Sequence, residues 1–316
     1  MTVQPDQRSA DHTIDLSILT VGYNSAQYLE RSLASLEPAL GQTNIEMVFI
    51  NNSEDRSEEL IAQKFPAVRT LPSQGNIGFG RANNILAQHA IGAWLLLLNP
   101  DTEVQPNAIN NLLRAAQGSP DYAILSAVTW INRDGSQQLP RMELPGIRTL
   151  ARGLVGQSAK PLLIDPTLPI TAAECVSGGC MMIRRDIWDE LGGFDEDFFL
   201  YAEDIDLCKR AVGKEFKLGI VRDAAIYHDL GSGEYFSPRR ILLQMRGNAH
   251  YFRKHFGPLH ALGCLVTLWL SAIVRFAIGG VLGWRQIKYR RMSQAFQSIA
   301  LAPWKWWRGY RKTPRT

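Results

Sequence analysis

A short segment of the sequence combines carboxylates and aromatic rings more densely than a solvated loop or a buried core requires. The segment 194–210 reads FDEDFFLYAEDIDLCKR and holds six carboxylate side chains and four aromatic ones. A solvated loop gains nothing from four rings, and a buried segment excludes unpaired charges because burying them is very costly. The segment is therefore predicted to hold a bound partner in place. The plainer alternative, an acid-capped helix after a loop, accounts for two of the carboxylates, because Ile205, Cys208 and Ala211 have helical spacing.

Three more polar clusters follow apolar runs in the first third of the chain. They occupy residues 22–24, 51–55 and 99–103, after apolar runs that begin at 16, 45 and 93. Segments with helical signals, at 25–40, 57–65 and 80–92, separate these runs and a short one at 68–73. Alternating strands and helices predict an α/β fold with a parallel sheet. Because such sheets bind ligands beyond the carboxyl ends of their strands, the clusters predict one binding site.

The charge of the chain is divided between two regions. The 316 residues carry a net charge of +4, but all 30 acidic side chains lie in residues 1–234 together with 19 basic ones. Residues 235–316 carry 15 basic side chains and no acidic one. An acidic body and a basic tail indicate that the tail meets nucleic acid or an anionic membrane.

Cysteine usage and the N-terminus bear on the compartment. The four cysteines are scattered and form no CxxC pair, which favours a reducing, cytosolic setting. Residues 1–13 are polar and have no apolar core, so we expect a flexible N-terminus rather than a secretory signal.

Six motifs, taken in order, resemble one enzyme family. TVGYNSAQYLERSLASL, NNSEDRS, GNIGFGRANN, LLLLNPDTEV, SGGCMMIRRDIWDELGGFDEDFFLYAEDIDLCKRA and YHDLGSGE look like family-2 inverting glycosyltransferases with the GT-A fold. The element with Asn76, Gly78, Phe79 and Asn83 is similar to the rhamnosyltransferase branch. The resemblance spans residues 14–256. It implies a Rossmann-like, mostly parallel sheet flanked by helices, followed by a helical, membrane-associated region at 257–316.

The resemblance also implies a divalent cation, Mg²⁺ or Mn²⁺, that binds the diphosphate of a nucleotide-sugar donor as a Lewis acid. Asp101 matches the last acid of the family's DXD-like motif, and His228 matches the histidine that completes the metal site. Asn99 stands where many relatives have the first acid, so the site has one carboxylate fewer. Without the resemblance, a lone histidine is more often a satisfied core residue.

Glu203 and Asp204 match the family's Glu-Asp pair. The resemblance implies that Asp204 is the general base for the acceptor hydroxyl and that Glu203 orients the acceptor or tunes Asp204. Asp204 is expected at a helix N-terminus, where the dipole favours the ionised carboxylate. The rings of Phe198, Phe199 and Tyr201 are expected to wall the sugar pocket.

The donor is expected to contact residues at the strand ends and in the glycine-rich segments. Relatives have an Asp that accepts the N3–H of uracil or thymine; here its place is taken by Ile50 or Asn51, and only the amide oxygen of Asn51 could accept that proton. Arg81 is a possible diphosphate partner. Gly178 and Gly179 would let the backbone approach the ligand, although a bulge in a strand would also explain them. The predicted donor-binding residues are Tyr23, Asn24, Asn51, Asp55, Asn76, Gly78, Phe79, Asn83, Asn99, Asp101, Gly178 and Gly179.

The C-terminal region predicts a membrane surface. Residues 259–284 are apolar apart from Arg275 and are followed by a stretch that interleaves Trp and Tyr with Arg and Lys. An interfacial or re-entrant anchor fits best, because an Arg inside a spanning helix costs about 2.5–3.5 kcal/mol. A true span and a soluble helical subdomain remain alternatives. The composition could also suit RNA, but no RNA-binding motif is present, so nucleic acid is not an expected partner.

Together these features predict a metal-dependent glycosyltransferase at the cytoplasmic face of the membrane. The expected reaction moves L-rhamnose from dTDP-rhamnose to a lipid-linked or cell-surface glycan. UDP-galactofuranose and UDP-hexoses are alternative donors. A protein that binds nucleotide sugars without activity is the rival from another class, and Asn99 is the residue that favours it.

Overall fold

The computed structural model describes residues 14–40, 43–135, 142–154, 157, 163–228 and 237–310. Within these ranges the strands form one nine-stranded sheet with the order β3-β2-β1-β4-β8-β6-β9-β5, and β7 pairs with β9. The N-terminal segment 1–13, predicted to be flexible, lies outside the described residues.

The first half of the sheet is parallel, as its alternating pattern predicts. β1 pairs in parallel with β2 and β4, and β2 pairs in parallel with β3. The elements of this half are β1 (Leu16–Gly22), α1 (Ala26–Ala34), α2 (Glu37–Leu40), β2 (Ile45–Asn51), α3 (Ser57–Lys64), β3 (Arg69–Leu71), α4 (Phe79–His89) and β4 (Trp94–Leu98).

The second half makes the sheet mixed rather than mostly parallel. β8 runs antiparallel between β4 and β6, whereas β6 and β9 are parallel and β5 and β7 pair antiparallel with β9. Its elements are β5 (Thr102–Val104), α5 (Ala108–Gly118), β6 (Tyr122–Trp130), β7 (Ile170–Ala173), β8 (Cys180–Arg184), α7 (Arg185–Leu191), α8 (Glu203–Gly213) and β9 (Lys217–His228).

Both faces of the sheet are covered, which explains the continuous apolar runs. Alternate side chains of β4 enter two different hydrophobic clusters: Leu95 and Leu97 pack on one face, and Leu96 and Leu98 on the other. A strand between two packed layers needs apolar residues at every position.

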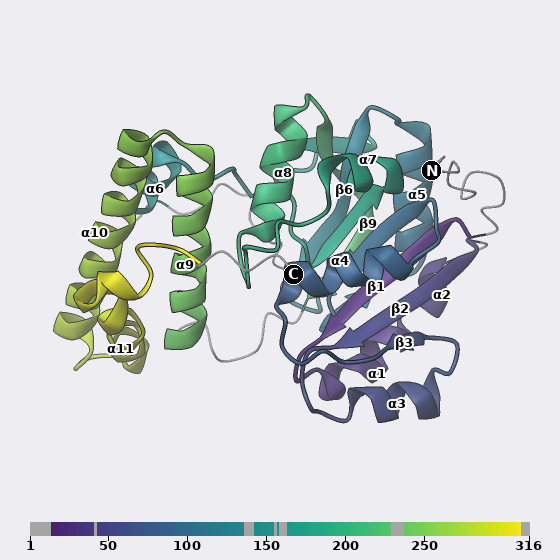
Figure 1. Cartoon of the computed structure of the whole chain (residues 1–316), viewed down its shortest axis with the longest axis horizontal. Coiled ribbons are helices and arrows are strands. Elements are labelled where there is room, and N and C mark those ends of the chain that lie inside the picture. Colours follow the sequence, from purple (N-terminus) through teal and green to yellow (C-terminus); the bar gives the residue numbers. More distant parts are fainter. Residues whose placement is uncertain are drawn as a thin grey trace, which may run out of the picture.

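The C-terminal helices form a third core beside the sheet (Figure 1). This core joins α9 to α10 and α11, and it includes Phe198 and Ala202 from the acidic segment. The boundary predicted between residues 256 and 257 falls at the junction of α9 and α10, so one hydrophobic core crosses it. The helices are α6 (Ile147–Leu154), α9 (Pro238–His255), α10 (Pro258–Leu282) and α11 (Ile287–Leu301).

A buried carboxylate attaches α8 to α9. Asp206 is fully buried and lies 2.8 Å from Nε of Arg210, 2.7 Å from Nζ of Lys254 and 2.7 Å from Nε2 of His255. Burial alone would raise the pKa of Asp206, but the hydrogen bond with His255 and the charges of Arg210 and Lys254 outweigh it and lower the pKa to about 2.

Replacing this carboxylate should destabilise the fold strongly. Asp206→Asn removes the buried counter-charge of Arg210 and one of the two carboxylates that contact Lys254, so the free energy of unfolding at pH 7 should fall by about 3–5 kcal/mol. Because the pKa is depressed in the folded state, the charge contributes fully above the ordinary carboxyl pKa of 3.8, and its contribution is lost as the pH falls toward 2. Urea unfolding at pH 7 and pH 3 measures both effects.

Asp121→Asn is the matched control, because Asp121 is an exposed carboxylate that pairs with Lys217 at 3.0 Å. Its change should stay within about 1 kcal/mol. Equal effects of the two substitutions would show that Asp206 does not anchor α8.

Candidate active site

Two adjoining cavities lie at the predicted edge of the sheet. The larger has a volume of about 640 Å³ and the smaller about 330 Å³. Their shared wall consists of Phe79, Leu200, Tyr201, Ser237 and Arg240. The two cavities therefore form one cleft with two compartments, large enough for an extended ligand.

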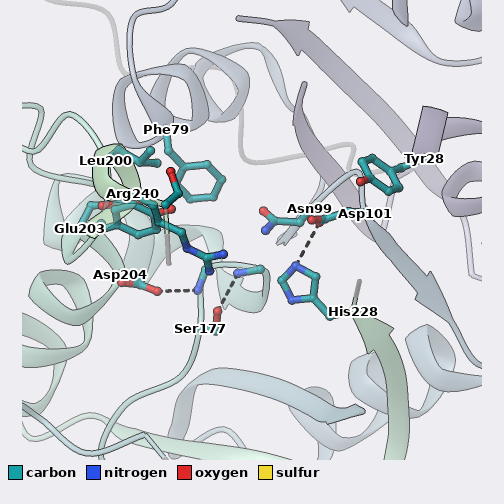
Figure 2. Close-up of a pocket in the computed structure, with 14 residues that line it drawn as sticks. Tyr28, Phe79, Asn99, Asp101, Ser177, Leu200, Glu203, Asp204, His228 and Arg240 are labelled. Atoms are coloured by element: carbon teal, nitrogen blue, oxygen red, sulfur yellow. Dashed lines mark hydrogen bonds and ion pairs between the residues drawn. The ribbon is translucent and has the colours of Figure 1, made fainter. Parts of the chain in front are cut away.

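One side of the larger cavity holds a carboxylate and an imidazole that face each other (Figure 2). The pairing of β5 with β9 places Thr102 opposite His228, which brings the preceding Asp101 to the histidine ring. Oδ1 of Asp101 is buried and lies 3.0 Å from Nε2 of His228, yet it accepts no hydrogen bond from the residues that the structure describes. A carboxylate oxygen and an imidazole nitrogen that face each other in this way fit a divalent cation such as Mn²⁺.

Asn99 and Gly179 complete this side of the cavity. The Asn99 backbone N–H donates to the Gly179 carbonyl at 2.9 Å. A Cβ on Gly179 would lie 3.1 Å from the ring of His228 and 3.3 Å from the amide of Asn99. Glycine therefore leaves room here for the two side chains to face the cavity.

The opposite side of the larger cavity carries the two carboxylates of the acidic segment (Figure 2). Asp204 accepts hydrogen bonds from the backbone N–H of Gly178 at 3.0 Å and of Ile205 at 2.8 Å. Burial nevertheless raises the pKa of Asp204 above its usual value, and these bonds offset only part of the rise. Asp204 lies in the first turn of α8, as predicted, but desolvation outweighs the expected preference for the ionised form.

Glu203 is buried more completely than Asp204. Its Oε2 atom is buried and has no hydrogen-bond partner in the part of the chain that the structure describes. Burial, with a further contribution from the charge of Asp204, raises the pKa of Glu203 well above its usual value. The site therefore holds two adjacent carboxyl groups whose pKa values are both raised by burial, that of Glu203 more than that of Asp204.

The aromatic side chains of the segment divide between the cleft and the core. Phe199 and Tyr201 line the cleft, as predicted. Phe198 does not: it is buried in the C-terminal core, 4.6 Å from the ring of His250.

The smaller cavity contains Tyr23, Asn76, Gly78 and Phe79 from the predicted donor set. It also contains Asn52, which sequence reasoning missed. The Nδ2 atom of Asn52 donates to the Gly78 carbonyl at 3.0 Å, whereas its Oδ1 atom is buried and has no hydrogen-bond partner among the described residues. The sequence signal for Asn52 was the pair of asparagines at the end of the second strand.

Asn51 does not line either cavity. It is fully buried, and its Oδ1 atom accepts hydrogen bonds from the backbone N–H and the hydroxyl of Ser53. Its Nδ2 atom donates to Asp55. Its amide is therefore already committed inside the loop.

Four other predicted residues support the cleft from outside its lining. Asp55 accepts hydrogen bonds from the backbone of Ala26 and Ser57, which ties two loops together. Asn24 likewise donates its backbone N–H to Ser53. The other two are Asn83, which donates to the Phe79 carbonyl, and Arg81, whose Nε atom lies 3.8 Å from Glu196.

The N-terminus of α9 adds a cation that was not predicted. Arg240 lines both compartments beside Tyr201 (Figure 2). Burial raises the pKa of Tyr201, and the charge of Arg240 counteracts part of that rise. The paired arginines that follow Pro238 were the sequence signal.

A second acidic group lies outside the cleft lining. Asp195, Asp197 and His250 place ligand atoms within 4.8 Å of one another. Nζ of Lys254 lies 2.6 Å from Asp195, so a cation already neutralises part of this group.

The chain is similar in sequence to known proteins. Residues 17–192 match the model of glycosyl transferase family 2. The chain is 31% identical over 238 residues to the N-acetylglucosaminyl-diphospho-decaprenol L-rhamnosyltransferase of Mycobacterium tuberculosis, covering 67% of this chain and 75% of that protein.

Solved structures share the fold at low identity. The mannosyltransferase PcManGT of Pyrobaculum calidifontis, in complex with GDP-Man and Mn²⁺, aligns with a TM-score of 0.58 and 16% identity over 96% of this chain and 91% of its own. GalNAc-T7 with UDP, GalNAc and Mn²⁺ aligns with a TM-score of 0.56 and 18% identity. The alignment covers 75% of this chain and 48% of GalNAc-T7. The fold is GT-A-like, and the chain belongs to glycosyl transferase family 2, in its rhamnosyltransferase-like branch.

Proposed function

We propose that the protein is an inverting glycosyltransferase that moves L-rhamnose from dTDP-rhamnose to a lipid-linked glycan. The observation that carries the proposal is the larger cavity, which faces a carboxylate of raised pKa, Asp204, toward the Asp101–His228 pair. The name of the mycobacterial relative supplies the sugar and the lipid-linked acceptor. UDP-galactofuranose and UDP-hexoses are the alternative donors.

Asp204 would act as the general base. The acceptor hydroxyl transfers its proton to Asp204 while its oxygen forms the new bond to the anomeric carbon and the nucleoside diphosphate leaves. Attack from the side opposite the diphosphate inverts the anomeric centre. Two backbone N–H groups fix the orientation of the carboxylate, and its raised pKa brings it closer to neutral pH, where a base accepts a proton more effectively. Glu203, with its neutral form favoured, can donate a hydrogen bond to the acceptor.

Asp101 and His228 would hold Mg²⁺ or Mn²⁺, which supplies Lewis acid chemistry at the diphosphate when bound. Asn99 contributes no charge, so Asp101 is the one carboxylate that the described residues would bring to the metal. Arg240 would add a positive charge to the diphosphate from the other side of the cleft. The two cationic sources together suit a diphosphate that is already anionic in the donor and gains a further negative charge as it leaves.

Asn52 would recognise the base of the donor. Its unpartnered Oδ1 atom can accept the N3–H of thymine or uracil, in a compartment walled by Tyr23, Asn76 and Gly78. Thymine and uracil both carry this N–H group, so the contact would favour donors with either base and would not distinguish between the two.

The protein would bind the cytoplasmic face of the membrane peripherally, through α10. Among the described residues a single helix, α10, is both long enough and apolar enough to cross a membrane. Arg275 turns inward, where it donates to the Ser271 carbonyl at 3.0 Å and lies over the ring of Phe296. The apolar residues of the opposite face are exposed, and we call them the α10 stripe: Leu259, Leu262, Leu270, Val274, Ile278 and Val281. One packed face and one exposed apolar face fit a helix that lies in the interface, with Trp284 and nearby basic residues at the headgroups.

The base assignment predicts a large loss of turnover. Asp204→Asn removes the proton acceptor, so kcat should fall by at least about 10²-fold. Transfer is measured with a panel of dTDP- and UDP-sugars in the presence of membranes, and nucleotide affinity by calorimetry. The affinity should change by less than about twofold, because the altered group contacts the acceptor.

Asp223→Asn, an exposed carboxylate paired with Arg222, should behave as wild type. Near-normal turnover by Asp204→Asn would remove this residue as the base. A wild-type protein that binds nucleotides but transfers no sugar would favour the inactive binding protein instead.

The metal assignment predicts that a chelator abolishes transfer and that Mg²⁺ or Mn²⁺ restores it. Asp101→Ala should also weaken the binding of Mn²⁺ itself. Binding is measured by EPR, because the signal of the free ion decreases as the protein binds Mn²⁺. Asp197→Ala is the matched control, because it alters the second acidic group and leaves the cleft intact. Full transfer in excess chelator, or loss of Mn²⁺ binding only in Asp197→Ala, would contradict the assignment of Asp101 and His228.

The α10 stripe predicts binding to vesicles that contain anionic lipid. The double variant Val274→Glu with Ile278→Glu should lose flotation with such vesicles, since each charge would enter the apolar layer. High salt should weaken binding of the wild type only in part, because salt screens the headgroup attraction and not apolar insertion. The double variant Ile91→Glu with Leu168→Glu, at exposed apolar positions of the sheet domain, should float normally. Equal flotation of both variants would place the contact elsewhere.

A further inference from the structure

The loop that leads into the two carboxylates has an unfavourable backbone. Tyr201 has a φ of 69° and Ala202 a φ of 75°, so two successive residues with side chains adopt the left-handed region. This region suits glycine and is disfavoured for other residues. Ala202 directly precedes Glu203, the first residue of α8, so the loop conformation sets where α8 begins. The surroundings must therefore hold the loop in place.

Contacts from two sides restrain the carbonyl groups of this loop. The Phe199 carbonyl accepts the backbone N–H of Phe79 at 3.0 Å, which ties the loop to the donor compartment. The Tyr201 carbonyl packs against α9 at Gly247, where an added Cβ would come within 2.2 Å of it. Between them, the Leu200 carbonyl needs a donor from elsewhere.

That donor comes from the C-terminal end of the described chain. The hydroxyl of Tyr310 donates to the Leu200 carbonyl and also lies 3.1 Å from the Leu243 carbonyl on α9. Its ring lies beside Phe199, with 6.5 Å between the ring centroids. The contact joins residues 110 positions apart in the sequence.

The segment before Tyr310 is itself firmly attached. Trp306 is fully buried and donates its indole N–H to the Ile299 carbonyl at 3.1 Å. Arg246 and Arg253, both on α9, donate to the Lys305 and Trp307 carbonyls at 2.9 and 3.1 Å. Because these contacts hold the segment that carries it, the Tyr310 side chain can act as a fixed support for the loop.

We propose that Tyr310 is a positioning residue that holds loop 199–202 in the conformation that places Tyr201, Glu203 and Asp204 in the cleft. Its catalytic meaning rests on the proposed function. The C-terminal region thus contributes to the active site from its inner face, in addition to presenting the α10 stripe on its outer face.

Amide hydrogen exchange on the full-length protein tests the support without any assay of transfer. Tyr310→Phe keeps the ring and removes the hydroxyl. Amides of residues 199–206 should exchange about fivefold faster, the effect of losing one hydrogen bond. Amides of β1 and β4 should be unchanged. Tyr289→Phe, a tyrosine in α11 whose backbone lies beside Gly279, is the control and should leave the loop unchanged. Unaltered loop exchange in Tyr310→Phe, or an equal rise throughout the chain, would overturn the proposal.

Transfer kinetics supply the second readout. In Tyr310→Phe, kcat should fall about five- to tenfold while the Kd for the nucleoside diphosphate changes by less than twofold. Adding Ala202→Gly should restore much of the loss, because glycine adopts a positive φ without steric cost and needs less support. An unchanged kcat, or a loss that glycine does not reduce, would show that Tyr310 does not position the loop. If the wild type transfers no sugar, the proposed function fails, and the exchange experiment still decides the role of Tyr310.

Discussion

The cleft depends on two carboxylates of α8, Asp206, which forms ion pairs, and Asp204, which accepts hydrogen bonds from the backbone. Asp204 and Asp206 lie two positions apart on one helix, yet burial raises the pKa of Asp204, whereas that of Asp206 falls to about 2. Asp206 meets three basic side chains, two of them from α9, whereas Asp204 accepts hydrogen bonds from two backbone N–H groups. Asp206 fixes α8 to its neighbour, and this fixed position places Asp204 in the lining of the cleft, without an ion pair to any of the described residues.

The sheet could be predicted where each local signal determines the structure. Apolar runs covered on both faces, separated by helices with clear periodicity, indicate the parallel half from β1 to β4. The antiparallel position of β8 could not be predicted in this way, because pairing direction depends on where the chain returns rather than on the strand's own residues. The Asp101–His228 pair was expected from motifs, and the register of β5 against β9 is the physical reason that the two side chains meet.

The donor compartment shows the limit of sequence reasoning at single-residue resolution. Asn51 and Asn52 are adjacent, and both are buried. Successive residues of a strand point to opposite sides, so one position decides whether an amide faces the cavity or the loop. The hydrogen bonds of Asn51 to its own loop leave Asn52 as the residue with an unpartnered oxygen in the cavity. Arg240 had a sequence signal in the paired arginines after Pro238, but only the fold shows that it lines the cleft. Tyr310 was not predictable, because its hydroxyl contacts carbonyl groups far away in the chain.

The C-terminal region combines two properties that composition alone cannot separate. The absence of acidic residues and the exposed apolar side chains are properties of its outer surface alone. The buried faces of the same helices form the core that receives Phe198 and Ala202, on either side of the loop that carries Tyr201. A chain shortened at residue 256 would therefore lose the packing around Phe198 and Ala202 as well as the α10 stripe, so it would not test the proposed membrane binding alone. Substitutions confined to exposed positions of α10 change the outer surface while the core beneath the cleft stays intact. The proposed membrane binding and the proposed catalysis can therefore be tested separately, because the exposed stripe and the packing beneath the cleft belong to two faces of the same helices.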